Sequence, residues 1–295
     1  MSSFLAAVGF GLVTASIVGL SAVALTLQLG VTNVPNFAHG EILTLGAYGA
    51  FEAQRFTSNL AVDALIGMAV GGLAALAMNL CVLQSFVKRG TRTIHLLIVT
   101  AGLSLVIQNV LIFFFSSTDQ SVKLPAAAQV PDHVGPFIWT PIDLATMGTA
   151  IAAMAVLYAV LKYTKFGKAQ RAVAGQPELA RVRGVPVTRI VNLTWLMAGL
   201  LAGLAGVAVA TTSGSVAPAS GGGYLLITFA AVVLGGVGKP QGALLAAVII
   251  GLAMEVSAVY VDAAYKEVIA VGILILAILF RPSGLFTTAR AVAER

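Results

Sequence analysis

Long apolar runs without a charged residue follow one another along the whole chain. Lys, Arg, Asp and Glu are absent from residues 1–40, 64–87, 93–118, 144–161 and 190–238. A helix that crosses a bilayer needs about 20 consecutive, mostly apolar residues, and several of these runs reach that length. The two-residue alternation of a membrane barrel strand is missing, so the pattern predicts an all-α, polytopic membrane protein.

Eight membrane-spanning helices are predicted, one of them as a broken pair. Their approximate ranges are 4–29, 38–54, 61–87, 93–116, 142–162, 190–211, 224–261 as the broken pair, and 263–281. Counted as two, the pair gives nine segments, one of them too short to span alone. Gly67-x-x-x-Gly71 and Gly199-x-x-x-Gly203 are typical of helices that approach closely. Residues 1–295 are therefore expected to form a single transmembrane domain.

Two uncharged stretches carry residues that disfavour a helix. Residues 30–40 read GVTNVPNFAHG, and residues 211–223 read TTSGSVAPASGGG. Non-helical backbone at membrane depth occurs where it is buried in protein or lines a wet cavity, and broken segments in two halves of a chain indicate a transport path. The alternative interpretation of each stretch is a loop at the membrane surface.

Positive charge is unevenly distributed between the predicted loops. One set of loops holds Lys88, Arg89, Arg92, Lys162, Lys165, Lys168, Arg171, Arg181, Arg183, Arg189, Lys239, Arg281, Arg290 and Arg295, whereas the other holds Arg55, Lys123 and Lys266. Because cytoplasmic loops retain Lys and Arg, the first set is predicted to be cytoplasmic. The N-terminus is then outside and the C-terminus cytoplasmic. The first apolar segment lacks a basic leader and is expected to be retained.

The composition and motifs give little support to an enzyme. Only 9% of the residues are charged and the mean hydropathy is +0.98, which excludes an ordinary nucleic-acid binder despite a pI of about 9.7. Cys81 is the only cysteine, the three histidines lack the H-E-x-x-H spacing, and no phosphate-binding G-x-x-x-x-G-K-[ST] string occurs. We therefore predict no catalytic residue, no metal site and no bound cofactor.

Three ionisable residues fall inside predicted membrane segments: His39, Glu41 and Glu255. Such groups are costly in a bilayer and are often functional when they face a protein interior. Each also has a structural explanation. His39 could bridge helices, Glu41 could lie at the cytoplasmic interface, and Glu255 could reach outward to Lys266.

The longest predicted cytoplasmic connection, residues 166–190, is the most polar part of the chain. A short helix is predicted to begin at Pro177, with Glu178 in its first turn, and to stop before Gly184 and Pro186. The segment could be a docking surface for a partner, or a basic loop beside anionic lipid.

Three strings, in order along the chain, resemble one known family. Residues 33–48, NVPNFAHGEILTLGAY, resemble the signature of the branched-chain amino acid permeases, the membrane subunits of ABC importers. Residues 171–190 resemble that family's cytoplasmic loop, and residues 232–243, VVLGGVGKPQGA, resemble its glycine-rich motif. Departures from the usual residues occur at Thr44, Val173, Gln176 and Gln241, so the resemblance leaves the substrate open.

The resemblance implies one permease subunit of an importer in a prokaryotic plasma (inner) membrane. Its expected partners are a second homologous permease, two ATP-binding subunits that use ATP and Mg, an extracytoplasmic substrate-binding protein and the lipid bilayer, with no nucleic acid. Import of branched-chain amino acids is favoured. Urea or short amides, a ribose-type solute, and a stand-alone channel or secondary transporter are the alternatives.

The resemblance and the intramembrane charges together assign two groups of residues. The expected translocation path or gate comprises Asn33, Asn36, His39, Gly40, Glu41, Gly221, Gly222 and Glu255. The expected contact with the ATP-binding subunits comprises Gln176, Pro177, Glu178, Leu179, Ala180, Arg181 and Gly184.

Overall fold

The computed structural model describes residues 2–134, 137–280 and 284, and most of these residues are helical. The helices are α1 (Ser2–Thr32), α2 (His39–Ala53), α3 (Leu60–Ala77), the π-helical η1 (Met78–Leu83), α4 (Gln84–Lys88), α5 (Thr93–Phe115), α6 (Pro141–Tyr163), α7 (Lys165–Gly175), α8 (Pro177–Val182), α9 (Val187–Ser213), α10 (Ser220–Gly235), α11 (Pro240–Ser257) and α12 (Lys266–Phe280), with single 3-10 turns η2 (Ala126–Ala128) and η3 (Ala263–Tyr265). The strands form two antiparallel pairs, β1 (Gln120–Ser121) with β4 (Ser215–Val216) and β2 (Asp132–Val134) with β3 (Phe137–Trp139).

Within the described residues, seven helical segments are long and apolar enough to cross a membrane. They are Phe4–Thr32, Leu60–Lys88, Thr93–Phe115, Pro141–Tyr163, Val187–Ser213, Pro240–Ser257 and Ala263–Phe280. The prediction of a polytopic all-α membrane protein is confirmed. Two of the expected spans differ, because α2 has only 15 residues and α10 only 16. Among the expected spans that the described residues cover, two are therefore short apolar helices, where one short segment was expected.

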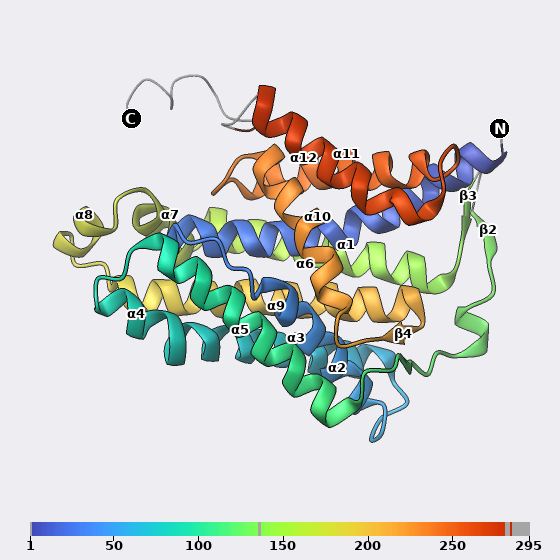
Figure 1. Cartoon of the computed structure of the whole chain (residues 1–295), viewed down its shortest axis with the longest axis horizontal. Helices are drawn as coiled ribbons and strands as arrows, with labels where there is room; N and C mark the ends of the chain where they lie inside the picture. Colours follow the sequence, from blue (N-terminus) through green and yellow to red (C-terminus); the bar gives the residue numbers. More distant parts are fainter. Residues whose placement is uncertain (1, 135–136, 281–283, 285–295) are drawn as a thin grey trace.

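The predicted breaks are shorter than the sequence suggested. Helix α1 continues to Thr32, and α2 begins at His39. Helix α9 continues to Ser213, and the glycines at 221–223 lie within the first turn of α10. The non-helical backbone is thus confined to residues 33–38 and 214–219. After α1 reaches one end of the molecule, the chain turns back and starts α2 partway along it (Figure 1).

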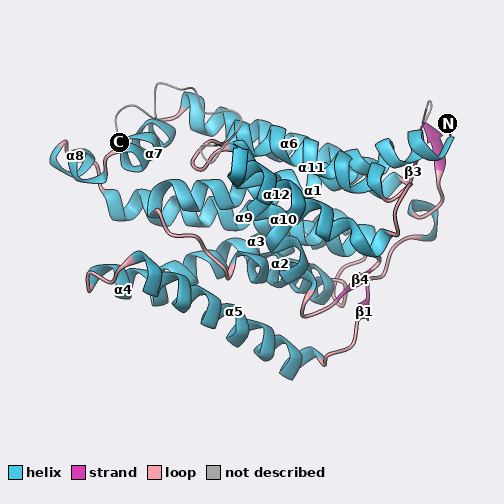
Figure 2. Ribbon diagram, turned by 45° about the horizontal axis from the view of Figure 1, so that its top comes forward, coloured by secondary structure: helices cyan, strands magenta, loops and turns pink. Residues whose placement is uncertain are grey.

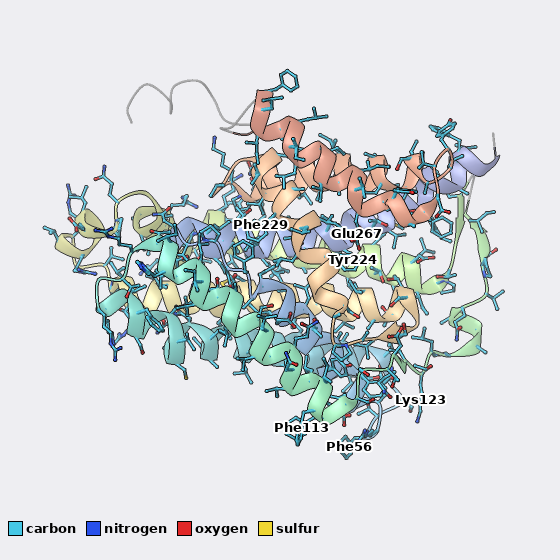
Figure 3. The ribbon with its side chains drawn as sticks, viewed as in Figure 1. Phe56, Phe113, Lys123, Tyr224, Phe229 and Glu267 are labelled. Atoms are coloured by element: carbon cyan, nitrogen blue, oxygen red, sulfur yellow. The ribbon has the colours of Figure 1, made fainter. Side chains whose placement is uncertain are left out.

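The two ends of the helical bundle carry different loops. Helices α4, α7 and α8 lie at one end in Figure 1, and the N-terminus and strands β2 to β4 lie at the other. The α10–α11 loop belongs to the basic end, since a Cβ on Gly30, near the end of α1, would lie 3.6 Å from the Gly238 Cα. Lys123 and Phe56 lie at the opposite end (Figure 3). The basic loops are therefore gathered at one end, as predicted, apart from Arg281, Arg290 and Arg295, which are outside the described residues.

Glycine contacts hold α2, α3 and α9 together at backbone distance. A Cβ on Gly46 would lie 2.6 Å from the Gly203 carbonyl oxygen, and one on Gly71 would lie 2.8 Å from that of Gly199. Side chains at these positions would force the helices apart, so the small-residue patterns do mark close helix contacts.

Helices differ strongly in how far the rest of the chain covers them. Within their most apolar windows, α1 and α9 are each 72% buried, whereas α12 is 11% buried and α5 and α6 are each 17% buried. Figure 2 shows α5 lying along the outside of the bundle. Trp195 on α9 and Leu20 on α1 are almost fully buried and mark the core. The outer helices present apolar faces of the kind that lipid or a partner subunit covers.

Candidate functional site

The two short helices, α2 and α10, begin against each other in the interior. A Cβ on Gly40 would lie 2.6 Å from the Gly221 carbonyl oxygen, so only glycine fits the contact. The Thr44 hydroxyl accepts a hydrogen bond from the Gly221 backbone N–H at 3.0 Å and donates to the Gly40 carbonyl at 3.2 Å. The structure thus joins the two breaks that the sequence predicted separately. Thr44 bonds to both helix starts, although sequence reasoning noted it only as a departure from a pattern.

Gly222 differs from its neighbour Gly221. Gly221 is buried, but Gly222 is exposed, and a Cβ placed on it would have no heavy atom within 4 Å. The two glycines, both assigned to the path from sequence, therefore occupy different environments.

Asn33 is also exposed, and its φ of 52° ends α1 in the left-handed conformation typical of a residue just after a helix.

A chain of buried hydrogen bonds surrounds His39. Its Nδ1 lies 3.2 Å from Gln28 Oε1, and Asn36 Nδ2 donates to the same oxygen at 3.2 Å. The amide oxygen only accepts, so Nδ1 donates and Nε2, 3.3 Å from Ser21 Oγ, accepts. Ser21 then accepts from Thr228 at 2.8 Å.

This His39 network connects three helices. Ser21 and Gln28 belong to α1, His39 to α2 and Thr228 to α10, and all four are fully buried. Breaking a buried hydrogen bond and leaving one partner unsatisfied costs about 1–3 kcal/mol, so the network fixes the mutual positions of the three helices. The sequence contains only a weak indication of this network. Ser21 and Gln28 are polar positions two turns apart on one face of an otherwise apolar helix.

Glu41 projects from the first turn of α2 toward α5. Its side chain is buried, and Oε1 accepts a hydrogen bond from Ser104 Oγ of α5 at 3.0 Å. Among the described residues, Oε2 has no hydrogen-bond partner. A carboxylate with one unmatched buried oxygen can accept a further donor, such as a hydroxyl, an amide or an ammonium group.

Glu255 is separate from this junction. It lies in α11, where Oε1 accepts from Thr14 of α1 at 3.0 Å and Oε2 pairs with Lys266 of α12 at 2.6 Å. The outward contact with Lys266 that the sequence left open is present. Both side chains line a cavity of about 540 Å³ between α1, α6, α9, α10, α11 and α12, at the end of the bundle opposite α7 and α8.

The predicted docking segment folds as two short helices. Thr164 begins α7 by accepting from the Gly167 N–H at 3.2 Å. Pro177 begins α8, and Gly184, with a φ of 81°, follows its end, so the predicted helix limits are confirmed. Arg171 also donates to the Leu161 carbonyl.

Helix α8 divides the predicted docking residues between two faces. Ala180 is buried and packs with Val173 of α7 and Ile190 of α9. Leu179 and Val182 are 51% and 84% exposed. Gln176, Pro177, Glu178, Arg181 and Gly184 are exposed as well. Ala180 therefore anchors the helix, and apolar Leu179 and Val182 form an outward surface together with charged neighbours.

Comparison with known proteins identifies a family of transport permeases. Residues 7–278 match the family described as "Branched-chain amino acid transport system / permease component". The chain is 28% identical over 287 residues to the high-affinity branched-chain amino acid transport system permease protein LivH of Salmonella typhimurium, covering 93% of this chain and 92% of that protein. It is 29% identical over 300 residues to the permease protein BraD of Pseudomonas aeruginosa, covering 93% of each.

A solved structure with a related fold is PsaBC from Streptococcus pneumoniae, determined in complex with a Fab. The TM-score is 0.52 at 14% sequence identity, and the match covers 94% of this chain and 92% of the other. At this identity the likeness concerns the fold alone.

Proposed function

The chain belongs to the branched-chain amino acid permease family, and from that premise we propose that it is the membrane subunit of an ATP-driven importer of branched-chain amino acids. The observation that carries the proposal is the family match over residues 7–278. In this proposal the protein is a multi-pass protein of a prokaryotic inner membrane. It forms half of the translocation path and performs no chemistry on its substrate.

The proposed complex contains a second homologous permease, two ATP-binding subunits and an extracytoplasmic binding protein. The chain itself has no phosphate-binding string, so ATP and Mg are held by the partner subunits. The exposed face of α8, with Leu179 and Val182 beside Glu178 and Arg181, is suited to a partner at the basic end. Apolar residues there need a cover, and the charged neighbours can set the register of the contact.

A continuous packed route leads from α8 to the junction of the short helices. Ala180 packs against Ile190 in the first turn of α9, and α9 extends to Ser213. Further along α9, Gly203 and Gly206 lie against the backbone of α2 at Gly46 and Leu43. Rigid contacts of this kind transmit a displacement because packed helices do not deform continuously. ATP-driven movement at α8 would thus reach α2 and α10.

Two alternative functions are tested in the same experiment. A urea or amide importer would have a similar architecture with a different solute, and a channel or secondary transporter would work without an ATPase. The Glu255–Lys266 pair in the cavity favours a zwitterionic solute over neutral urea, because only a zwitterion carries a full charge opposite to each member of the pair.

The test is to co-express the chain with a candidate second permease and candidate ATP-binding subunits, and to purify the complex through a tag on this chain. ATPase activity is then measured in proteoliposomes with the binding protein loaded with leucine, urea or ribose. Stimulation by the leucine-loaded protein is expected. Stimulation by only the urea-loaded protein would identify urea, and not a branched-chain amino acid, as the substrate. Leucine flux without any ATPase would favour the channel or secondary transporter.

A further inference from the structure

The cavity beside Glu255 has the size and position of a small-molecule site. Its volume of about 540 Å³ falls within the range of roughly 300–1,000 Å³ that is usual for ligand pockets. It lies at the end that carries the N-terminus and β3 (Figure 1), which the charge distribution predicts to be external. In the proposed importer, this end faces the binding protein that delivers the substrate.

The wall of the cavity combines two opposite charges. Glu255 and Lys266 are paired at 2.6 Å, with 15% and 30% of their side chains exposed, so water reaches the pair only in part. Thr14 donates to the second oxygen of Glu255 at 3.0 Å and fixes the carboxylate orientation. Asp143 also lines the cavity, but its carboxylate accepts from the Thr140 N–H at 2.9 Å and the Thr140 hydroxyl at 2.7 Å.

Glu267 lies close to the cavity without being part of its lining. Its Oε1 would be 3.2 Å from a Cβ on Gly223, next to Tyr224, whose side chain does line the cavity. Figure 3 shows Tyr224 and Glu267 near each other at the start of α10. A second carboxylate therefore lies next to the cavity wall, near the start of α10.

The rest of the lining includes an apolar wall. Phe10, Val13 and Ile17 follow one face of α1, and Leu124 and Ile142 contribute from the 117–141 connection and the start of α6. A ligand with a charged head and a short aliphatic side chain would match both parts of this lining.

Resting on the proposed function, we propose that the cavity receives a free aliphatic α-amino acid, with its ammonium group on Glu255 and its carboxylate on Lys266. The ligand exchanges the internal ion pair for two charge-assisted hydrogen bonds. Because the zwitterion brings one charge of each sign, neither Glu255 nor Lys266 is left unpaired in a partly buried site. The aliphatic side chain packs on Phe10, Val13 and Ile17. A ligand with a single charge would leave one protein charge without a partner.

The test uses the assembled complex in nanodiscs without the binding protein, so that this subunit is free to bind the ligand. Saturation-transfer difference NMR, which detects weak binding, is recorded with L-leucine, with leucinamide, which lacks the carboxylate, and with 4-methylpentanoate, which lacks the ammonium group. Leucine is expected to bind at least about tenfold more tightly than either analogue, as one lost charge-assisted hydrogen bond requires.

Two variants separate the two halves of the site. Glu255→Gln should weaken leucine binding and remove the preference for leucine over 4-methylpentanoate, since the ammonium group no longer has a charged partner. Lys266→Gln should remove the preference for leucine over leucinamide. A purely structural ion pair would not change these two ratios selectively. Glu52→Gln is the matched control, because Glu52 forms an ion pair with Arg55 at the same end but outside the cavity.

The proposal is overturned if leucine gives no saturable signal with the wild-type complex, if both analogues bind as well as leucine, or if Glu52→Gln changes the ratios as much as the cavity variants do. If the Glu255→Gln complex does not assemble, the ratio of leucine to leucinamide binding in Lys266→Gln tests the proposal alone. Normal leucine uptake without any of these effects would refute the cavity assignment and leave the importer function intact. An ATPase that responds only to urea or ribose would refute the branched-chain amino acid substrate, and leucine flux without any ATPase would refute the ATP-driven importer.

Discussion

Gly221→Ala is the most direct test of the contact between α2 and α10. The added Cβ would lie 2.5 Å from Thr44 Oγ1 and 2.6 Å from the Gly40 carbonyl carbon, and it would collide with the Gly40 carbonyl oxygen. Two of these three atoms are backbone, so no side-chain rotation relieves the overlap. One of the two short helices has to move. Gly222→Ala is the matched control, because the same methyl group would meet no atom within 4 Å.

The expected magnitudes follow from three contributions. Forcing a methyl group into a packed contact costs about 1–3 kcal/mol. Losing the hydrogen bond from the Gly221 N–H to Thr44 costs about 1 kcal/mol more. Alanine recovers about 1 kcal/mol relative to glycine within a helix. The free energy of unfolding should therefore fall by about 1–3 kcal/mol in Gly221→Ala. It should stay the same or rise by up to about 1 kcal/mol in Gly222→Ala.

The assay is thermal unfolding of the purified chain in detergent, followed by the loss of the monodisperse peak in size-exclusion chromatography. The order of apparent midpoints should be Gly221→Ala below wild type, and Gly222→Ala at or above wild type. Leucine uptake by the reconstituted complex should fall with Gly221→Ala. Equal midpoints for the two alanine variants would refute the close approach of Gly40 and Gly221.

The remaining predictions concern the docking segment, the orientation and the His39 network. The double variant Glu178→Gln, Arg181→Gln should reduce leucine uptake several-fold and leave the complex assembled, and normal uptake would contradict the docking role of α8. In a cysteine-free background, a membrane-impermeant maleimide should label Phe56→Cys in intact spheroplasts and Val182→Cys only after permeabilisation. These positions are 87% and 84% exposed and lie at opposite ends of the bundle. The reverse labelling pattern would show that the chain has the opposite orientation in the membrane. Gln28→Ala removes the acceptor for two buried groups and should lower the free energy of unfolding by about 1–3 kcal/mol, and an unchanged unfolding midpoint would contradict the network.

Features encoded within one segment could be predicted from the sequence. Charge-free runs located the helices because a bilayer span requires about 20 apolar residues in succession. The proline at 177 and the glycine at 184 set the limits of α8 because their backbone preferences are local. The glycine spacings of α3 and α9 indicated close packing, and the structure shows which helices make it.

Contacts between distant segments could not be predicted in this way. Thr44 and Gly221 are 177 residues apart, and no periodicity relates them. The sequence indicated two breaks but not that they meet, and it grouped Gly221 with Gly222 although one is buried and the other exposed. Glu255 was grouped with His39 because both are ionisable within apolar runs. Only the fold shows that Glu255 lies in a separate cavity, where Lys266 and Thr14 satisfy its carboxylate.

Helix α10 is held at three points along its length, and this limits how a path beside it can open. Its first turn bonds to Thr44 of α2, Thr228 bonds to Ser21 of α1, and Gly235 packs against Gly242 of α11. Tilting α10 alone would break at least one buried hydrogen bond. Helices α1, α2, α10 and α11 are therefore expected to move as one body.

The boundary of that body lies where packing is sparse. Helices α5, α6 and α12 are mostly exposed, so a movement of the other helices relative to them exposes little buried surface area. Ser104 of α5 and Glu41 of α2 form a hydrogen bond across this boundary. Opening between α2 and α5 would release that bond and free a carboxylate whose other oxygen, among the described residues, is already without a partner. An ammonium group that enters between α2 and α5 would compensate the charge of the Glu41 carboxylate. We therefore expect Glu41 to contact a solute only when α2 and α5 separate.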